Sequence, residues 1–446
     1  MNFIKNIVLK IADMLGLKLS EKPLICDDYS KVNSISLTAA IAQRVSTLTL
    51  MDSNIRIIGE SRRAYYLNQL WGSDIIDKLD TACEVALGTG DALIKPYCID
   101  GRIGFDIIKN GNFYICESVG DYIKACIVLC ETIRKDNGNV YTRYETQRIR
   151  KTTDENGNEM NVLFIYTQAF LNDREIDLES VPEWSGIEPV VAISNVDYLL
   201  FGRIKSPTVN RENINSTNGV PITFGLDSVM TKCVEAYNRL NEEYENKEAF
   251  IFADKSLFVN NSDGSKKYSI PKGKERLFMK MPNSYGDKDG ASSLINEYSP
   301  DIRDDSFING IEQNYKMLEM LAGLSSGILT NPTTNYATAT EIKASLHLTF
   351  AYMTKFRRFI EKGVKQLFYA INVLADMNNI TDVGDYEVSI DWSSAYVENL
   401  TEQYTRLIQA ESIGAVSKAE VRAWLLDEEI DVANRAVSEI SSNNNI

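Results

Sequence analysis

The segment 225–376 constrains the fold more than any other part of the chain, because apolar residues recur there every three or four positions in three long stretches. The first stretch carries Met230 and Cys233 on its apolar side and mostly acidic residues on the other. The second covers 301–327, and the third begins near residue 341. This spacing predicts three long helices, each with one apolar face that needs a partner. The segment is therefore predicted to run as helix, insert, helix, short loop and helix.

The insert and the short loop differ from the helices in composition. The insert, 251–300, holds short strand-like runs separated by glycine-containing turns, which predicts a small folded piece with strands. It also contains a cluster of basic residues, namely Lys266, Lys267, Lys272, Lys274, Arg276 and Lys280. Docking to an acidic partner surface explains this cluster, a solvated strand face explains it equally well, and the sequence leaves both open. The loop, 328–340, is polar and contains a proline.

Residues 1–224 have the pattern of a mixed α/β body. Apolar residues at helical spacing predict helices near 4–15 and 74–87. Over 92–201, short apolar runs alternate with turn dipeptides, which predicts an antiparallel sheet. The dipeptides are Asp100-Gly101, Asn110-Gly111, Asn137-Gly138 and Asn156-Gly157. The polar segment 202–219 is rich in asparagine, and we interpret it as a linker.

The C-terminal part is predicted to contain one strand and then short helices. Val388 and Ile390 alternate with polar residues over 386–392, as expected for a strand. Ser417 is followed three residues later by Glu420, which is the capping-box pattern of a helix start. Together with the body and the insert, these elements predict an α+β fold class.

Charge and cysteine content limit the classes of function. The formal net charge is −15 at pH 7, which argues against a protein that holds nucleic acid through many neutralised phosphates. It does not argue against a protein that DNA slides past, because an acidic wall disfavours phosphate adhesion. Acidity that serves only solubility stays open as the simpler explanation. The seven scattered cysteines form no CxxC pair, so we expect reduced thiols in the cytoplasm. No apolar run reaches the length of a membrane span, and we expect no membrane association.

The sequence carries no recognisable catalytic motif. The single histidine, His347, lies in an apolar helix without a second ligand or nucleophile at a known spacing, so we expect a structural role for it. The glycine-rich stretch 88–91 lacks the GK[ST] of a phosphate loop and is expected to be a turn. Asp304 and Asp305 suit a helix start better than a metal pair. We therefore expect no enzyme activity, no metal and no cofactor.

Four segments, in this order, carry a resemblance to a known family. They are 86–97 (ALGTGDALIKPY), 225–240 (GLDSVMTKCVEAYNRL), 337–342 (ATATEI) and 407–425, which contains Gly414 and Ser417. They resemble, respectively, the wing segment, the first stem helix, the end of the tunnel loop and the crown of tailed-bacteriophage portal proteins with the large siphophage architecture. The resemblance covers nearly the whole chain.

The resemblance implies a portal-type architecture with a mixed α/β wing, two long stem helices, a small α/β clip, a long kinked wing helix and a helical crown. Its parts would be a wing at 1–224, a first stem helix at 225–250, a clip at 251–300, a second stem helix at 301–327, a tunnel loop at 328–340, the long wing helix with a closing strand at 341–398, and the crown at 399–446.

The resemblance also implies function and partners. It implies a ring of twelve copies at one capsid vertex of the virion, assembled in the cytoplasm of a bacterial host. The ring would be the channel for packaging and ejection of double-stranded DNA. Its clip would dock the large terminase subunit and later the head–tail adaptor, and the major capsid and scaffolding proteins are further implied partners.

The same resemblance places the predicted tunnel loop closest to DNA. The loop residues that would meet DNA are Asn331, Thr333, Thr334, Asn335 and Tyr336. These side chains are neutral hydrogen-bonding groups, so they can touch a moving duplex without holding each phosphate tightly. Two other readings remain open: a ring or baseplate component of a phage-like particle without DNA passage, and a metal-dependent hydrolase that would rest on acidic clusters alone.

Overall fold

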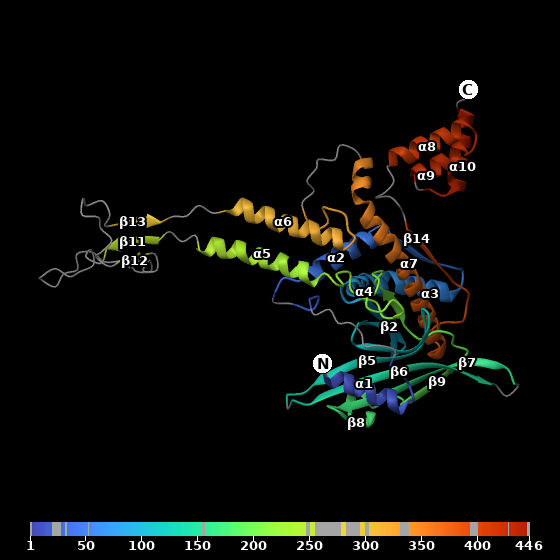
Figure 1. Ribbon diagram of the computed structural model, residues 1–446. Helices are drawn as coiled ribbons and strands as arrows, with labels where there is room; N and C mark the ends of the chain where they lie inside the picture. The colour runs from blue at the N-terminus through green and yellow to red at the C-terminus, as the bar shows by residue number, and fades with distance from the viewer. Residues whose placement is uncertain are drawn as a thin grey trace, which may run out of the picture. The chain divides into compact units, whose positions relative to one another are not determined.

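The chain folds into an α+β structure, shown as a computed structural model in Figure 1. The described residues are 2–19, 28–31, 34–51, 53–136, 138–153, 157–246, 250–254, 278–281, 295–298, 303–330, 339–392, 400–426 and 428–443. They form two compact units: unit 1 comprises Met1–Phe224 and Ala322–Ile446, and unit 2 comprises Gly225–Leu321. The α+β class predicted from the sequence is confirmed.

A six-stranded antiparallel sheet forms one part of unit 1. Its strands are β4 (Phe113–Val119), β5 (Tyr122–Arg134), β6 (Val140–Thr153), β7 (Glu159–Leu171), β8 (Arg174–Ile176) and β9 (Val190–Ser194). They run in the order β4-β5-β6-β7-β8, and β9 also pairs with β7. Neighbouring side chains of a strand point to opposite faces. Ile127 of β5 therefore packs against the helix α1 (Asn2–Met14), while Cys126 lies in the core on the other side.

A second, three-stranded sheet shares that core. Its order is β10 (Gly202–Lys205), β2 (Asp91–Ile99) and β3 (Arg102–Lys109). The helices α4 (Ile76–Thr89) and α7 (Ala339–Met377) pack on it. The backbones of α7 and β10 approach closely, because a Cβ on Gly202 would lie 2.6 Å from the carbonyl oxygen of Gly363. Glycine at this crossing lets the longest helix seat directly on the sheet.

Among the described residues of unit 1, two ion pairs have both side chains largely shielded from solvent, and one of these pairs joins the two sheets. The Lys95 ammonium of β2 lies 2.9 Å from the Glu145 carboxylate of β6. Burial alone would lower the pKa of Lys95, but the charge of Glu145, the nearby Cys130 and the hydrogen bond to Glu145 together outweigh burial and raise that pKa to about 12. Burial alone would raise the pKa of Glu145, but Lys95 and a hydrogen bond from Gln147 hold it below its usual value. Each group of the pair is thus kept in its charged form.

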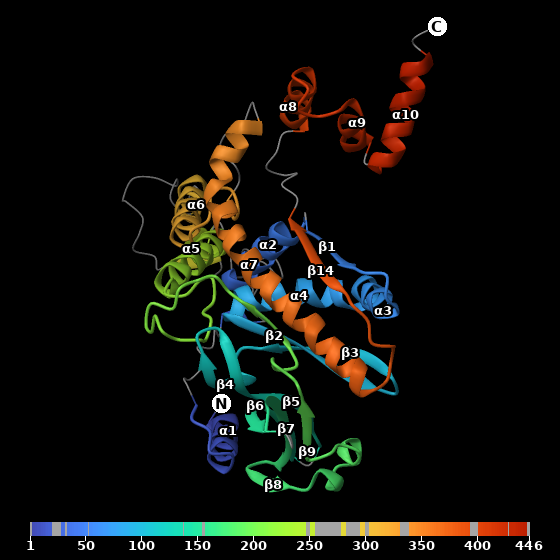
Figure 2. The same ribbon diagram turned by 90° about the vertical axis from the view of Figure 1, so that its right-hand side faces the viewer.

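The remaining elements of unit 1 join distant parts of the chain. They are α2 (Leu37–Leu50), β1 (Ser53–Ile58), α3 (Arg62–Leu70), a π-helical turn (Trp71–Ile75), β14 (Glu387–Trp392), α8 (Leu400–Ser412), α9 (Lys418–Leu426) and α10 (Ile430–Asn443). Strand β1 pairs with β14 in a two-stranded antiparallel sheet (Figure 2). The capping box is confirmed: Ser417 Oγ accepts from the Glu420 N–H at 3.2 Å, and Glu420 Oε2 accepts from the Ser417 N–H at 2.6 Å.

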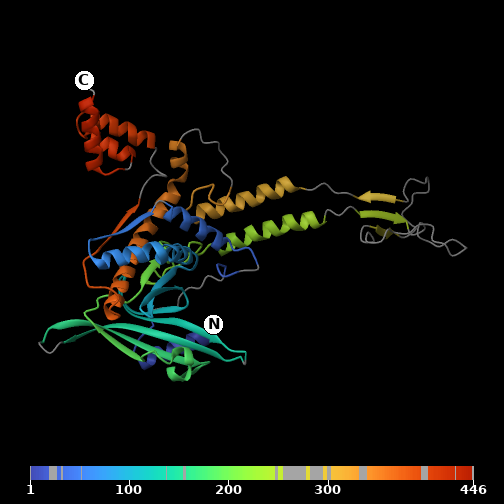
Figure 3. The ribbon, with the colours of Figure 1, turned by 180° about the vertical axis from the view of Figure 1, so that it is seen from behind.

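Unit 2 contains two long helices and a small sheet. Helices α5 (Asp227–Asn246) and α6 (Asp304–Leu321) lie side by side, as Figures 1 and 3 both show. The sheet has the order β12 (Phe278–Met281), β11 (Phe250–Asp254) and β13 (Ile295–Tyr298). Strands β11 and β12 are parallel, and β13 is antiparallel to β11. The insert was expected to be α/β, but its described parts are all strands.

Three sequence predictions differ from the structure. Asn110-Gly111 does not form a hairpin, since it joins β3 of one sheet to β4 of the other. The segment 202–219 is not a linker: it begins with β10, and Gly219 packs against Gly90. Helix α6 ends at Leu321 and not at residue 327, because Gly323 takes a positive φ of 74° that ends a right-handed helix.

Candidate functional site

The α5–α6 pair is joined at one end by a two-pronged ion pair. Arg303, just before α6, donates from Nε and Nη2 to the two carboxylate oxygens of Glu243 at 3.1 Å each. Its guanidinium also lies over the Phe307 ring, 5.5 Å from the ring centre. These hydrogen bonds lower the pKa of Glu243. A forked contact of this kind fixes orientation as well as distance, but the Arg303 side chain is 70% exposed, so solvent weakens the pair.

The two helices are acidic and carry uncovered apolar side chains. They hold nine acidic residues against three basic ones. Glu235, Glu242 and Asp305 are exposed, so part of this negative charge faces solvent. Tyr237 is 41% exposed and Met320 is 60% exposed. These side chains offer apolar surface that a neighbouring chain could cover.

The predicted tunnel-loop residues, Asn331, Thr333, Thr334, Asn335 and Tyr336, lie outside the described residues. The segment that leads into the loop is well anchored in unit 1. The Ser325 N–H donates to Thr349 Oγ1 at 2.9 Å, and the Thr349 N–H donates to Ser325 Oγ at 3.2 Å. The Arg44 guanidinium donates to the carbonyl oxygen of Ile328. The start of the loop is thereby tied to both α7 and α2.

The basic cluster of the insert lies almost entirely outside the described residues. Of its six members, Lys280 belongs to β12, and the other five, Lys266, Lys267, Lys272, Lys274 and Arg276, fall between described strands. The structure therefore does not test whether these side chains lie together. The cluster stays a prediction.

The glycine stretch 88–91 proves to be a packing junction. A Cβ on Gly88 would overlap the Tyr29 ring, and Gly90 has a φ of 103° with the carbonyl oxygen of Gly219 only 2.5 Å from where its Cβ would be. The turn expected from the sequence is present, and glycine is needed at both positions for separate reasons.

The turn at residues 88–90 places Asp91 next to Arg203, with which it forms a buried ion pair. Asp91 is fully buried, and its two oxygens accept from Nε and Nη2 of Arg203 at 3.0 and 2.8 Å. One of these oxygens also accepts from the Gly219 N–H at 2.5 Å. Sequence reasoning missed Arg203 because it treated 202–219 as a linker. The buried pair ties β2, β10 and the segment before unit 2 into one body.

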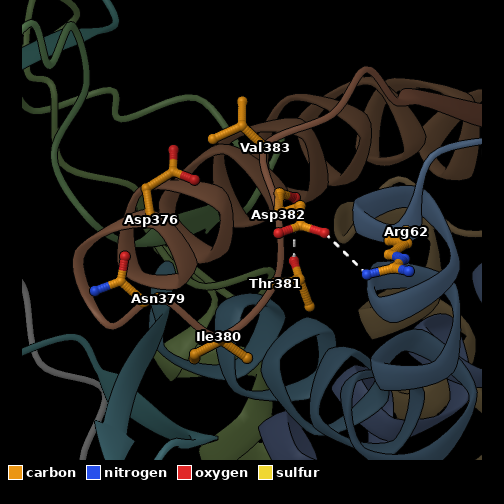
Figure 4. Close-up of a pocket in the computed structure, with 7 residues that line it drawn as sticks. All are labelled: Arg62, Asp376, Asn379, Ile380, Thr381, Asp382 and Val383. Atoms are coloured by element: carbon orange, nitrogen blue, oxygen red, sulfur yellow. Dashed lines mark hydrogen bonds and ion pairs between the residues drawn. The ribbon is translucent and has the colours of Figure 1, made fainter.

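A second buried arginine holds the end of α7. Arg63 is fully buried and uses all five N–H groups of its guanidinium. Its acceptors are Thr381 Oγ1 and Thr381 O, Asn372 O and Asn372 Oδ1, and Asp376 Oδ1, at 2.5–3.0 Å. The neighbouring Arg62 instead reaches Asp382 at 3.1 Å across a surface hollow of about 510 Å³ (Figure 4).

Residues that could carry other chemistry have ordinary surroundings. His347 is exposed on α7. The six cysteines that the structure describes have free thiols, and four of them, Cys83, Cys116, Cys126 and Cys233, are buried. Within the described ranges, no group of three or more His, Cys, Asp or Glu side chains is placed to hold a metal ion. Of the described helices, none combines the length and apolar character needed to cross a bilayer.

An α+β body that carries a long acidic helix pair with uncovered apolar side chains belongs to the class of subunits that assemble with other chains. Comparison with known families identifies the class further. The family model described as phage portal protein, SPP1 Gp6-like, matches residues 49–443. The chain belongs to this family of phage portal proteins, as its sequence resemblance predicted. A comparison with curated proteins finds no significant match.

Family membership gives the general role. Portal proteins are structural components of the bacteriophage capsid that form oligomeric rings and take part in DNA packaging, with contacts to capsid, DNA and terminase. The family indicates no catalytic activity.

Proposed function

We propose that this chain is the ring-forming subunit at a unique capsid vertex, and that the ring is the channel for packaging and ejection of double-stranded DNA. In this proposal twelve copies form the ring, and helices α5 and α6 are the stem around the channel. The insert between them is the clip that docks the terminase motor and then the head–tail connector. Unit 1 supplies the wing and the crown.

The observation that carries the proposal is the combination of negative charge and uncovered apolar surface on α5 and α6. In a ring, each subunit presents one surface to one neighbour and a different surface to the other. Exposed apolar side chains such as Ile308 and Met317 would be covered by the adjacent copy. The acidic side chains would remain on the channel wall.

An acidic wall suits passage of DNA better than capture of DNA. Like charges repel the phosphate backbone over roughly 8 Å at physiological salt. The duplex would then be kept from the wall, and contact would be left to the neutral loop at 331–336. The anchors at Ser325, Thr349 and Arg44 support this role, because they hold the start of that loop on the body.

Electron microscopy of the purified protein tests ring formation. The expected result is a ring with a central opening wide enough for a DNA duplex. A protein that stays monomeric under all assembly conditions would contradict the proposal. Rings whose opening is too narrow for a duplex would favour a ring or baseplate component without DNA passage.

Deletion of residues 331–336 tests the loop separately from the ring. We expect the deletion to leave rings intact and to impair DNA packaging or retention. The matched control replaces the same six residues by a Gly-Ser loop of equal length, which distinguishes loss of side chains from loss of chain length. Heads that fill normally with the deleted protein would refute the role of the loop.

Charge reversal tests clip docking. The variant Lys272→Glu, Lys274→Glu, Arg276→Glu is expected to weaken binding of the terminase while rings still form. A control with the same change in net charge reverses three exposed residues of unit 1, namely Lys5, Arg102 and Lys124. Unchanged packaging by the clip variant would show that the basic cluster is only a solvated face.

A further inference from the structure

One face of α7 lines a pocket in unit 1 that the portal role does not use. The pocket is open to solvent, has a volume of about 600 Å³, and is also bordered by β10, the β4–β5 turn, Tyr198 and Tyr386. The residues that α7 contributes are Phe359, Lys362, Lys365, Gln366 and Tyr369, which recur at helical spacing. This volume is typical of sites that bind small molecules.

The pocket is positively charged in a chain that is strongly acidic overall. Four cationic side chains and one carboxylate line it, namely Arg203, Lys205, Lys362, Lys365 and Asp121. The Lys362 ammonium lies 3.1 Å from Asp121, but both side chains are more than 60% exposed, so this pair is weak and easily rearranged. Arg203 is already paired with the buried Asp91, and Lys365 with Glu361, so the positive charge available to an anion comes mainly from Lys205 and Lys362.

Lys205 is the cation best placed to hold such an anion. Its Nζ donates to the carbonyl oxygen of Thr217 at 2.8 Å, which uses one of its three N–H groups. Within the described parts of the chain, it forms no ion pair with a carboxylate. Burial, and then the nearby charge of Arg203, lower the pKa of Lys205. The carboxylates of Asp91 and Asp121 favour its charged form from a distance, but no described carboxylate forms an ion pair with it, so a ligand anion would be a direct partner for this partly buried charge.

Aromatic rings form the apolar wall of the pocket. Tyr198 packs edge-to-face against Tyr122 and Tyr369, with ring centres 5.8 and 5.3 Å apart. The Tyr122 hydroxyl donates to the carbonyl oxygen of Asp197 at 2.6 Å, and the Tyr369 hydroxyl accepts from the Asp197 N–H at 2.8 Å. The Tyr122 proton is thus used, while the Tyr369 hydroxyl only accepts and can still donate, so the wall offers mainly ring surface together with one O–H donor.

We propose that this pocket binds a small organic anion. Lys205 and Lys362 hold its carboxylate or phosphate group, and its flat apolar part packs against Tyr198 and Tyr369. Two charge-assisted contacts and an aromatic wall together select a ligand that has both parts. The proposal concerns a site within a single subunit and does not depend on ring formation or DNA passage.

Isothermal titration calorimetry of the full chain tests the proposal with four probes: AMP, indole-3-acetate, adenosine and inorganic phosphate. We expect AMP, indole-3-acetate or both to bind at least tenfold more tightly than adenosine and inorganic phosphate, and the two probes identify which anion is preferred. No binding by either at millimolar concentration would overturn the proposal. If adenosine bound as tightly as the organic anions, the contact between the lysines and the anionic group would be excluded. If inorganic phosphate bound as tightly as the organic anions, the contact with the aromatic wall would be excluded.

Variants locate the binding in the pocket. Lys205→Gln should weaken binding of the preferred probe at least tenfold, and Lys205→Arg should retain most of it. Lys362→Gln serves as a second variant, because that side chain is 63% exposed and its loss leaves the core intact. The control Lys151→Gln removes an exposed lysine outside the pocket and should leave affinity unchanged. Wild-type affinity in both Gln variants of the pocket would refute the assignment.

Discussion

Replacing Arg63 by lysine should loosen the end of α7 without unfolding the rest of the protein. The guanidinium donates five hydrogen bonds to Asn372, Asp376 and Thr381 from a fully buried position. Lysine keeps the charge but has three donors on one nitrogen, so it cannot reproduce the planar fork. At least two of the five hydrogen bonds must be lost.

The size of the effect follows from the groups involved. A hydrogen bond to a charged group contributes about 1.5–3 kcal/mol, and its loss leaves a buried acceptor unsatisfied. The Asp376 side chain is 40% exposed, so its share is reduced by solvent. Loss of two buried hydrogen bonds then costs about 3 kcal/mol. Local opening should become about a hundredfold more frequent, since each 1.4 kcal/mol is a factor of ten.

Hydrogen exchange measured by mass spectrometry is the suitable assay, because it reads local opening peptide by peptide. Peptides that cover 372–382 should exchange about a hundredfold faster in Arg63→Lys. Peptides from the six-stranded sheet should not change. The adjacent Arg62 provides a matched control, since its ion pair with Asp382 is 86% and 75% exposed. Arg62→Lys should change exchange by less than about fivefold.

Equal exchange in the two variants would refute the reasoning. It would mean that the buried guanidinium of Arg63 stabilises the end of α7 no more than a surface ion pair does. Faster exchange throughout the chain would also contradict it, because the side-chain hydrogen bonds that Arg63 forms with described residues run to the end of α7 and the turn after it.

Three further predictions concern the same body. Gly90→Ala should lower the melting temperature more than Gly101→Ala. Both glycines have a positive φ, but only at Gly90 would the added Cβ collide with backbone atoms, so equal shifts in melting temperature would contradict this. Asp91→Asn should lower the free energy of unfolding in urea by about 3–5 kcal/mol, because it breaks a buried ion pair, and the exposed control Glu159→Gln should have a much smaller effect. The pKa of Glu145 is lower in the folded than in the unfolded protein. Its contribution to stability is therefore fully present at pH values above the unfolded-state pKa and is lost as the pH falls through the folded-state pKa. Glu145→Gln should therefore lose less stability than the wild type as the pH falls below about 5, and identical acid unfolding profiles would refute this.

Local sequence patterns predicted where helices, strands and turns lie better than they predicted which strands pair with each other. The dipeptide Asp100-Gly101 predicted a hairpin and joins β2 to β3, because both strands it separates belong to one sheet. Asn110-Gly111 has the same signal but lies between two sheets. A turn dipeptide specifies a reversal of the backbone, and which strand the chain pairs with afterwards depends on side chains far away in the sequence.

The interpretation of 202–219 as a linker was wrong for a related reason. Glycine and asparagine are common in linkers, but they also permit close approach of backbones. Gly219 lies against Gly90, and Arg203 finds its carboxylate at Asp91, more than a hundred positions away. No local pattern records either contact. The predicted loop and docking residues fall largely outside the described residues and stay predictions.

The division of unit 1 into two stretches has a consequence for synthesis. Strand β1 ends at Ile58, and its partner β14 begins at Glu387, more than three hundred residues later. At 5–20 residues per second, the ribosome needs on the order of tens of seconds to supply that partner. Until then β10 also lacks the helix that covers it. The nascent body therefore stays incomplete until all of unit 2 has been made, so subunits gain their final surfaces, and with them the ability to join neighbours, only near the end of translation.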